Sequence, residues 1–319
     1  MNRFLHFALF LSWALVLSLS CARQEPLQMG VDKFAQAGGN PMHYVEKGSG
    51  PPVILIPGLF GTLRMWDRMI PYLEKQYRLI AIDNFGTGNS GRPNDGFRYS
   101  VAEQADMVIA MMDELEISRC DFIGVSYGGM IALNIAARYP GRVGKVVSIE
   151  GAVIMPREHR YKRVEEGLSY PIIGDTIIGL IQSGLFDELM ARDIMGPAWT
   201  ELAAGEKMEL LDIISHNARA ASRLTWLGLA RALINSDDFA EEAKSITAPV
   251  LYLSGGKSSF REMTAMNIAY FKDNLPNVRI VSFADGVHDL ELQKPRETSA
   301  LIRTFIGDRT LQDKTISSR

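Results

Sequence analysis

One serine is well placed to act as a nucleophile. Residues 124–128 read Gly-Val-Ser-Tyr-Gly, so that Ser126 lies between two glycines. The segment follows an apolar run at 120–123 and precedes a helical pattern rich in Ala, Leu and Ile. A strand, a sharp turn and a helix in this order push the serine hydroxyl out of the sheet, and glycines avoid clashes in so tight a turn.

A serine hydroxyl is a poor nucleophile near neutral pH and needs an adjacent base. His288 is the best candidate, because it follows the last apolar strand-like run, residues 278–283, where catalytic loops are expected. The alternative interpretation is a structural or surface histidine. The other four histidines lie in the N-terminal segment, at an early strand and in a helical region: His6, His43, His159 and His216.

Strand-like and helical patterns alternate along most of the chain, which predicts an α/β fold with a mostly parallel central sheet flanked by helices. The expected strands are 53–56, 77–82, 122–125, 143–149, 250–253 and 278–283. The expected helices are 63–76, 100–115, 130–138, 262–274 and 295–305. Between 152 and 240 the strand patterns vanish and apolar helical segments take over. This insertion predicts a helical cap over the carboxyl edge of the sheet, where ligands bind in open α/β folds.

The expected domain organisation places this cap within one core. Residues 1–20 are predicted to form a signal peptide and residues 21–40 a polar tether. The core is expected in two pieces, 41–151 and 241–308, with the helical cap at 152–240 between them. Residues 309–319 are expected to form a polar tail.

Several blocks, in this order, make residues 40–308 resemble the α/β-hydrolase family. They are Pro57–Gly61 after the first buried strand, Asp83–Pro93 after the second, the turn at Ser126, and His288 near the end. The family order is serine, acid, histidine. The glycine-rich loop 83–93 could be misread as a phosphate-binding motif, but no helix starts directly after it and no acidic ribose partner follows. The resemblance implies a serine hydrolase without a cofactor.

The acid departs from the commonest family pattern, which puts an aspartate after the strand 250–253. Here that loop, 254–259, reads Ser-Gly-Gly-Lys-Ser-Ser and holds no carboxylate. Some members, the haloalkane dehalogenases among them, carry the acid at the end of the strand after the nucleophile. In this chain that place holds Glu150, directly after the strand 143–149. The resemblance therefore implies a Ser-His-Glu triad.

Three other interpretations of the acid stay open. Glu150 could be an ordinary surface glutamate. Asp285 and Asp289 could replace it, although both lie so close to His288 in sequence that reaching its far ring nitrogen would be awkward.

The resemblance also implies an oxyanion hole made of two backbone N–H groups. They belong to Tyr127, directly after the nucleophile, and to Leu59 in the first loop. Such donors stabilise the charge that develops on the tetrahedral intermediate. Most family members have a histidine where this chain has Pro57, so a side chain that braces the loop is lost while the backbone donors remain.

The N-terminus predicts export. Residues 1–3 carry a positive charge, residues 4–19 are nearly all apolar, and small residues precede Cys21. This is the layout of a secretory signal peptide, and Cys21 resembles the lipidated first residue of a bacterial lipoprotein. The alternative is an uncleaved membrane anchor, because about 17 apolar residues can just span a bilayer. The mature protein is expected in the periplasm or attached to a membrane as a lipoprotein, or otherwise secreted.

The overall composition limits the partners. The 319 residues are 47% hydrophobic and 22% charged, as in globular proteins with a large core. A net charge of −3 argues against general binding of nucleic acid. Histidines and carboxylates do not cluster at ligand spacing, so no metal is expected. With only two cysteines in the sequence, Cys21 and Cys120, a disulfide scaffold is excluded.

These observations predict a cofactor-independent serine hydrolase, of carboxylesterase or lipase type, that acts on a small-molecule acyl substrate with an apolar group. A thioester, lactone, amide or carbon–carbon bond stays open as the bond that is cleaved. A non-catalytic ligand-binding protein on the same fold is the alternative from another functional class.

Overall fold

The computed structural model describes residues 30–93, 96–155, 160–234, 239–308 and 311–316. Its centre is a nine-stranded sheet with the order β1-β2-β4-β3-β5-β6-β7-β8-β9. β2 pairs antiparallel with β1 and β4, and all other pairs are parallel. The strands are β1 Asp32–Ala37, β2 Asn40–Lys47, β3 Pro52–Ile56, β4 Arg78–Ile82, β5 Cys120–Val125, β6 Val143–Ile149, β7 Val250–Gly255, β8 Val278–Phe283 and β9 Lys314–Ile316.

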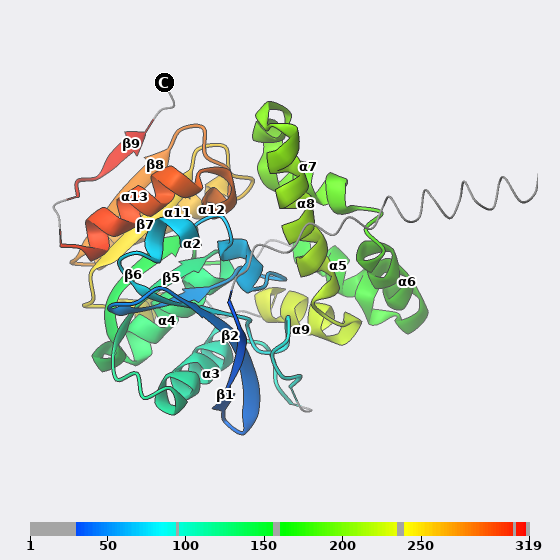
Figure 1. Ribbon diagram of the computed structural model, residues 1–319, viewed down its shortest axis with the longest axis horizontal. Helices are drawn as coiled ribbons and strands as arrows, with labels where there is room; N and C mark the ends of the chain where they lie inside the picture. The colour runs from blue at the N-terminus through cyan, green and yellow to red at the C-terminus, as the bar shows by residue number, and fades with distance from the viewer. Residues whose placement is uncertain (1–29, 94–95, 156–159, 235–238, 309–310, 317–319) are drawn as a thin grey trace, which may run out of the picture.

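Helices cover both faces of this sheet (Figure 1). The core helices are η1 Leu63–Trp66, α2 Ile70–Leu73, α3 Val101–Glu114, α4 Tyr127–Arg138, η2 Pro140–Arg142, α10 Ala240–Ala243, α11 Arg261–Asn274, α12 Leu290–Gln293 and α13 Pro295–Ile306. One hydrophobic cluster contains α3, α4 and α11, and the other contains η1, α2 and α13. Alternate residues of β3 enter opposite clusters, because side chains along a strand point to alternate faces. This explains why the central strands are apolar throughout.

Apart from α10, the helices between β6 and β7 form a group beside the core, shown in green and yellow in Figure 1. They are α5 Arg160–Ser169, α6 Pro171–Gln182, α7 Asp187–Met195, η3 Gly196–Glu201, α8 Ala204–Arg219 and α9 Arg223–Ile234. Two small clusters of buried side chains hold them together, one around Trp199 and one around Ile178. We call these helices the cap.

The structure differs from the predicted elements at three places. The helix expected over 63–76 is two short pieces, η1 and α2, because Pro71 lacks the N–H that a continuous helix would need. The tether expected over 21–40 includes β1, which pairs with β2 through its backbone although its own pattern is weak. The tail expected over 309–319 includes β9, which extends the sheet beside β8.

Other expected elements are found, among them the helix after Ser100. α3 begins with a capping box in which Ser100 and Glu103 each bind the other's backbone N–H. The predicted signal peptide and Cys21 lie outside the described residues. Within the described part of the chain, no helix is long and apolar enough to cross a membrane.

Candidate active site

Ser126 lies at the turn between β5 and α4, in a backbone conformation that few residues adopt. Its φ is 52° and its ψ is −118°, whereas most non-glycine residues avoid positive φ. A Cβ atom on Gly124 would lie 2.2 Å from the carbonyl oxygen of Gly128, and one on Gly128 would lie 2.1 Å from that of Ile56. The two glycines are therefore required for the strand and helix to pack closely enough to hold Ser126 in this turn.

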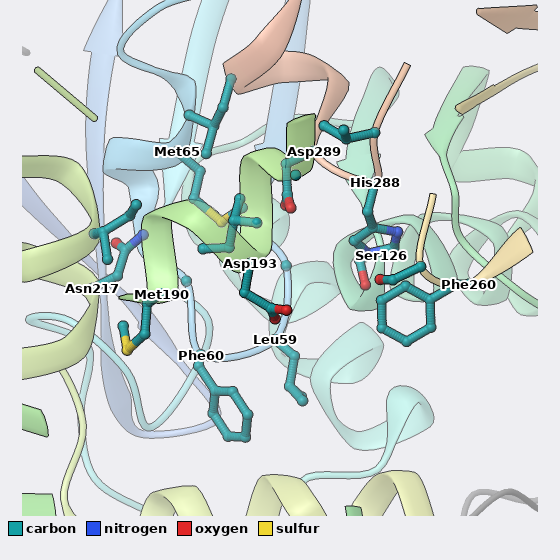
Figure 2. A pocket seen from close by; sticks show the side chains of 18 of the residues that line it. Leu59, Phe60, Met65, Ser126, Met190, Asp193, Asn217, Phe260, His288 and Asp289 are labelled. Atoms are coloured by element: carbon teal, nitrogen blue, oxygen red, sulfur yellow. The ribbon is translucent and has the colours of Figure 1, made fainter. Parts of the chain in front are cut away.

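His288 and Glu150, which follow two other strands, meet at the same edge of the sheet. Glu150 comes directly after β6 and is 1% exposed. Its Oε2 lies 2.6 Å from Nδ1 of His288. A carboxylate can only accept, so the imidazole carries its proton on Nδ1 and leaves Nε2 as an acceptor. Figure 2 shows the Ser126 side chain beside the His288 ring.

Two residues at the end of β7 and in the loop that follows hold the Glu150 carboxylate. The backbone N–H of Gly255 donates to Oε1 at 2.7 Å, and the Ser258 hydroxyl donates to Oε2 at 2.6 Å. The loop that lacks the expected aspartate thus supplies hydrogen-bond donors to a carboxylate from the neighbouring strand. Sequence reasoning missed both residues. The only available signal was that the loop follows the strand next to β6, which places it beside Glu150.

The other two candidate acids have different surroundings. Asp285 is paired with Lys294 at 2.8 Å. Asp289 is 9% exposed and lies at the pocket, close to the fully buried Glu291. Burial raises the pKa of Asp289, and burial and the neighbouring Asp289 raise the pKa of Glu291 well above its usual value. Nδ1 of His288 faces Glu150, so neither aspartate takes the orienting position in this structure.

The two predicted oxyanion donors come from the loop after β3 and from the start of α4. Tyr127 is the first residue of α4, and the first N–H groups of a helix have no partner within it. Leu59 lines the pocket together with Ser126. The loop passes close to the nucleophile, since a Cβ atom on Gly58 would lie 3.6 Å from the Cβ of Ser126. Both donors thus belong to segments that adjoin Ser126.

The core holds one side of this first loop. Asp83, at the end of β4, accepts a hydrogen bond from the backbone N–H of Leu63 at 2.9 Å. The amide of Asn84 donates to the carbonyl oxygen of Pro57 at 3.1 Å. Asp83 in turn binds Nδ1 of the buried His43 at 2.7 Å. The loop therefore has polar partners even though Pro57 replaces the usual histidine.

The cap holds the other side of the loop. Oδ1 of Asn217, on α8, accepts from the backbone N–H of Thr62 at 3.1 Å and from its hydroxyl at 2.6 Å. The ring of Phe60, whose φ is 61°, stacks on Trp226 of α9 with 4.0 Å between ring centroids. Sequence analysis did not foresee these contacts, because nothing in one sequence relates a cap helix to a loop more than 150 residues earlier.

A pocket of about 790 Å³ lies between core and cap at this site. Ser126, His288, Leu59 and Phe60 line it from the core side, and Figure 2 shows their side chains around one space. Most of its wall is apolar. Besides Ser126 and His288, its polar side chains are those of Asp193, Asn217, Lys257, Ser259 and Asp289. No group of His, Cys, Asp and Glu in the described ranges is arranged to hold a metal ion. The arrangement suits nucleophilic attack by an activated serine on a small molecule.

Comparisons with known proteins agree with this architecture. Residues 51–173 match the family model described as the alpha/beta hydrolase fold. A solved structure, the enol-lactonase from Burkholderia xenovorans LB400, has a TM-score of 0.73 at 20% identity, over 86% of this chain and 100% of that one. At this identity the likeness shows the fold alone.

Two curated relatives match in sequence over a shorter stretch. Cis-3-alkyl-4-alkyloxetan-2-one decarboxylase from Shewanella oneidensis is 31% identical over 126 residues, 39% of this chain and 40% of that protein. 2-Hydroxy-6-oxo-2,4-heptadienoate hydrolase from Pseudomonas putida is 34% identical over 127 residues, 39% of this chain and 45% of that protein. The match thus spans less than half the length of either relative. With the sheet, the turn at Ser126 and the family model in agreement, the chain has the α/β-hydrolase fold.

Proposed function

We propose that this protein is a serine hydrolase that cleaves a small acyl ester through an acyl-enzyme. The observation that carries the proposal is the buried hydrogen bond between Glu150 and Nδ1 of His288, beside Ser126 and on the same pocket. A carboxylate in this position keeps the imidazole in the tautomer that can accept a proton and stabilises the imidazolium that forms. A binding protein without catalysis would have no need of this arrangement.

In the first half-reaction, Oγ of Ser126 attacks the ester carbonyl carbon while Nε2 of His288 takes the hydroxyl proton. The backbone N–H groups of Leu59 and Tyr127 donate hydrogen bonds to the former carbonyl oxygen and stabilise its negative charge. When the bond to the leaving group breaks, the imidazolium returns the proton to the departing alkoxide. The products of this step are an alcohol and Ser126 carrying the acyl group.

In the second half-reaction, water replaces the alcohol. His288 takes a proton from the water, and the hydroxide attacks the acyl carbon. The second tetrahedral intermediate uses the same two N–H donors. It collapses to a carboxylic acid and to Ser126, whose Oγ recovers the proton from His288. Glu150 orients the ring in both halves and does not itself take up the proton.

The pocket wall favours a substrate with an apolar acyl or alkyl group. Apolar side chains from core and cap surround the space next to Ser126: Met65, Leu189, Met190, Ile194, Ile214 and Leu292. Binding sites for small molecules are usually such apolar cavities with a few polar groups that orient the ligand. We therefore expect esters of medium or long aliphatic acids to react faster than acetates.

Cleavage of a carbon–carbon bond is the second candidate. It is supported by the relative from Pseudomonas putida, whose name describes hydrolysis of 2-hydroxy-6-oxo-2,4-heptadienoate. The same serine and histidine could serve either reaction. Turnover of a 2-hydroxy-6-oxo-dienoate with no turnover of any ester would favour this candidate over the ester hydrolase.

The test is hydrolysis of p-nitrophenyl esters from acetate to palmitate. Wild type is compared with Ser126→Ala and His288→Ala, and with His216→Ala as a matched control at a cap histidine. Loss of turnover in the first two variants, with turnover kept in the control, supports the proposal. Absence of turnover by wild type on every ester and on the dienoate would leave the non-catalytic binding protein as the better interpretation.

Export is proposed separately. It rests on the basic start, the apolar residues 4–19 and Cys21 in the sequence. Fractionation of expressing bacteria, followed by mass measurement of the mature N-terminus, tests it. A chain that starts at a lipidated Cys21 or keeps the apolar segment in the membrane fraction supports attachment, whereas an unprocessed chain in the cytosol contradicts export.

A further inference from the structure

The cap helix α6 is apolar around nearly its whole circumference. Its twelve residues, Pro-Ile-Ile-Gly-Asp-Thr-Ile-Ile-Gly-Leu-Ile-Gln, include six large aliphatic side chains besides the proline. On one side, Gly174 and Ile178 are buried against neighbouring cap helices. An amphipathic surface helix would carry polar residues on the opposite side. Here the opposite side is also apolar.

The outer side of α6 is exposed in this structure. Ile172 is 84%, Ile173 53%, Ile177 37% and Leu180 41% exposed. At 3.6 residues per turn these four positions fall within an arc of about 140°. They lie on one side of α6, which we call the α6 face; the exposed Thr176 falls within the same arc, and its hydroxyl donates to the carbonyl oxygen of Ile172. Monomeric soluble proteins rarely expose such contiguous apolar surface without a partner.

The exposed apolar surface continues toward the candidate active site. Leu185, in the turn after α6, is 68% exposed, and Leu189, in the first turn of α7, is 63% exposed. Leu189 also lines the pocket that contains Ser126. More than half of the exposed large hydrophobic side chains of the described residues lie between 170 and 189. Exposed apolar side chains thus follow the α6 face along the chain as far as Leu189, at the pocket.

The α6 face carries no free charge. Asp175 is the only charged residue of α6, and its Oδ1 is paired with Nε of Arg223 at 2.7 Å. A neutral apolar face suits insertion among lipid acyl chains, because no ion has to leave water. It is less suited to a partner that would be recognised by charge.

The N-terminal sequence indicates that a lipid bilayer would lie close to the protein. Residues 4–19 form an apolar segment, and Cys21 is the predicted lipidation site. Lipidation of Cys21, or retention of residues 4–19 as an anchor, would attach the chain to a bilayer. Residues 20–29 separate that segment from Gly30, the first described residue, and span at most about 35 Å when fully extended. A chain of this size has a radius of gyration of about 19 Å, so one of its faces must stay near the membrane.

We propose that the α6 face rests on the surface of a phospholipid bilayer, with Leu185 and Leu189 between the lipid and the pocket. This orientation buries the exposed apolar side chains of α6 in the adjacent lipid. It also lets an apolar substrate enter the pocket from the membrane. The orientation itself does not depend on the proposed hydrolase activity, whereas the delivery of substrate does.

The direct test is photolabelling of the full-length chain in phosphatidylcholine vesicles that contain a phosphatidylcholine with a diazirine on its acyl chain. Peptide mass spectrometry then locates the adducts. We expect severalfold more label on α6 than on α11, an exposed helix of the core that serves as the matched control. We also expect label on residues 4–19 if the chain is attached through them.

Each contrary result has a distinct meaning. Label on residues 4–19 but not on α6 would leave the attachment intact and overturn the orientation. Equal label on α6 and α11 would reflect nonspecific contact and overturn it as well. Absence of label on α6 would also overturn the proposal if a second copy or another part of the chain is found to cover that helix. That copy or segment would then be the occupant of the α6 face.

A kinetic test separates substrate delivery from chemistry. Ile172→Ser combined with Ile173→Ser should leave the rate on a water-soluble ester unchanged and lower the rate on a vesicle-borne ester by about tenfold. Met266→Ser, at an exposed apolar position of α11, should change neither rate. If the double variant keeps the full rate on vesicles, the α6 face does not deliver substrate. If wild type hydrolyses neither ester, the proposed function fails and the photolabelling still decides the orientation.

Discussion

At the residue scale, the carboxylate of Glu150 has three hydrogen-bond partners in the candidate active site. It accepts hydrogen bonds from Gly255, Ser258 and His288 while it is almost fully buried. Three donors on one buried carboxylate fix its position closely. In this chain the segment at the end of β7 therefore donates hydrogen bonds to Glu150 and does not carry the acid itself.

Glu150→Gln tests the orienting role. The amide keeps the size of the side chain but would favour the wrong imidazole tautomer. We expect kcat for a soluble ester to fall by about a thousandfold or more with little change in thermal stability. Steady-state kinetics and a melting curve measure both. Full activity in this variant would point to Asp289 as the acid.

Ser258→Ala tests the support of Glu150. The variant removes one of three donors to the carboxylate, so we expect kcat to fall by about tenfold while KM stays the same. Ser258→Thr, which keeps the hydroxyl, should recover most of the rate. Equal losses in both variants would mean that the size of the side chain matters and the hydrogen bond does not.

The positions of Ser126, His288 and Glu150 could be predicted because each follows an apolar strand of a parallel sheet. Carboxyl ends of parallel strands meet at one edge, so residues far apart in sequence converge there. Gly255 and Ser258 could not be predicted as partners of Glu150, because their role depends on the path of a loop. Only the three-dimensional arrangement contains that information.

At the element scale, the loop after β3 is held between core and cap. Leu63 binds Asp83 on one side, while Thr62 binds Asn217 and Phe60 stacks on Trp226 on the other. Since this loop carries the proposed donor of Leu59, the cap contributes to its position. A change in the cap should therefore affect catalysis as well as substrate binding.

Asn217→Ala tests this coupling. The substitution removes the acceptor for two hydrogen bonds from Thr62, so the loop loses its polar contact with α8. We expect kcat to fall by about tenfold. Asn217→Asp keeps an acceptor at the same place and should retain more activity. A change in KM alone would mean that Asn217 only contacts substrate.

The pair of His43 and Asp83 predicts a pH dependence of stability. Burial lowers the pKa of His43, but hydrogen bonds with Asp83 and Asp32 and their negative charges outweigh burial and raise it. A raised pKa stabilises the fold below the unfolded-state value of about 6.5, and the contribution is lost as pH rises through the folded-state value. The free energy of unfolding in urea should therefore decrease above neutral pH more in wild type than in His43→Gln. Parallel curves would contradict this role.

The elements themselves were predicted with uneven success. Long periodic segments such as α3 and the strands β6 and β8 were foreseen closely. The break between η1 and α2 departs from the predicted single helix because Pro71 interrupts an otherwise helical pattern. β1 was missed because it is held by pairing with β2, and its own sequence has little alternation.

At the scale of the whole molecule, the cap and core enclose the candidate site between them. An α/β fold could be predicted from alternating strand and helix patterns, and the helical character of residues 152–240 from the loss of strand patterns there. The α/β-hydrolase fold in particular was implied by the family resemblance. The contacts that join cap to core could not, since Arg64 with Asp212 and Arg68 with Glu206 pair residues more than 130 positions apart. Substrate access therefore depends on an interface that the sequence patterns do not reveal.

The central claim is that Ser126 is a nucleophile that becomes covalently acylated. The most direct measurement is the intact mass of the protein after reaction with a fluorophosphonate, followed by peptide mapping. We predict one adduct per chain, located on Ser126 and absent from the Ser126→Ala variant. No adduct on folded wild-type protein, or an adduct that persists in Ser126→Ala, would contradict the proposed mechanism.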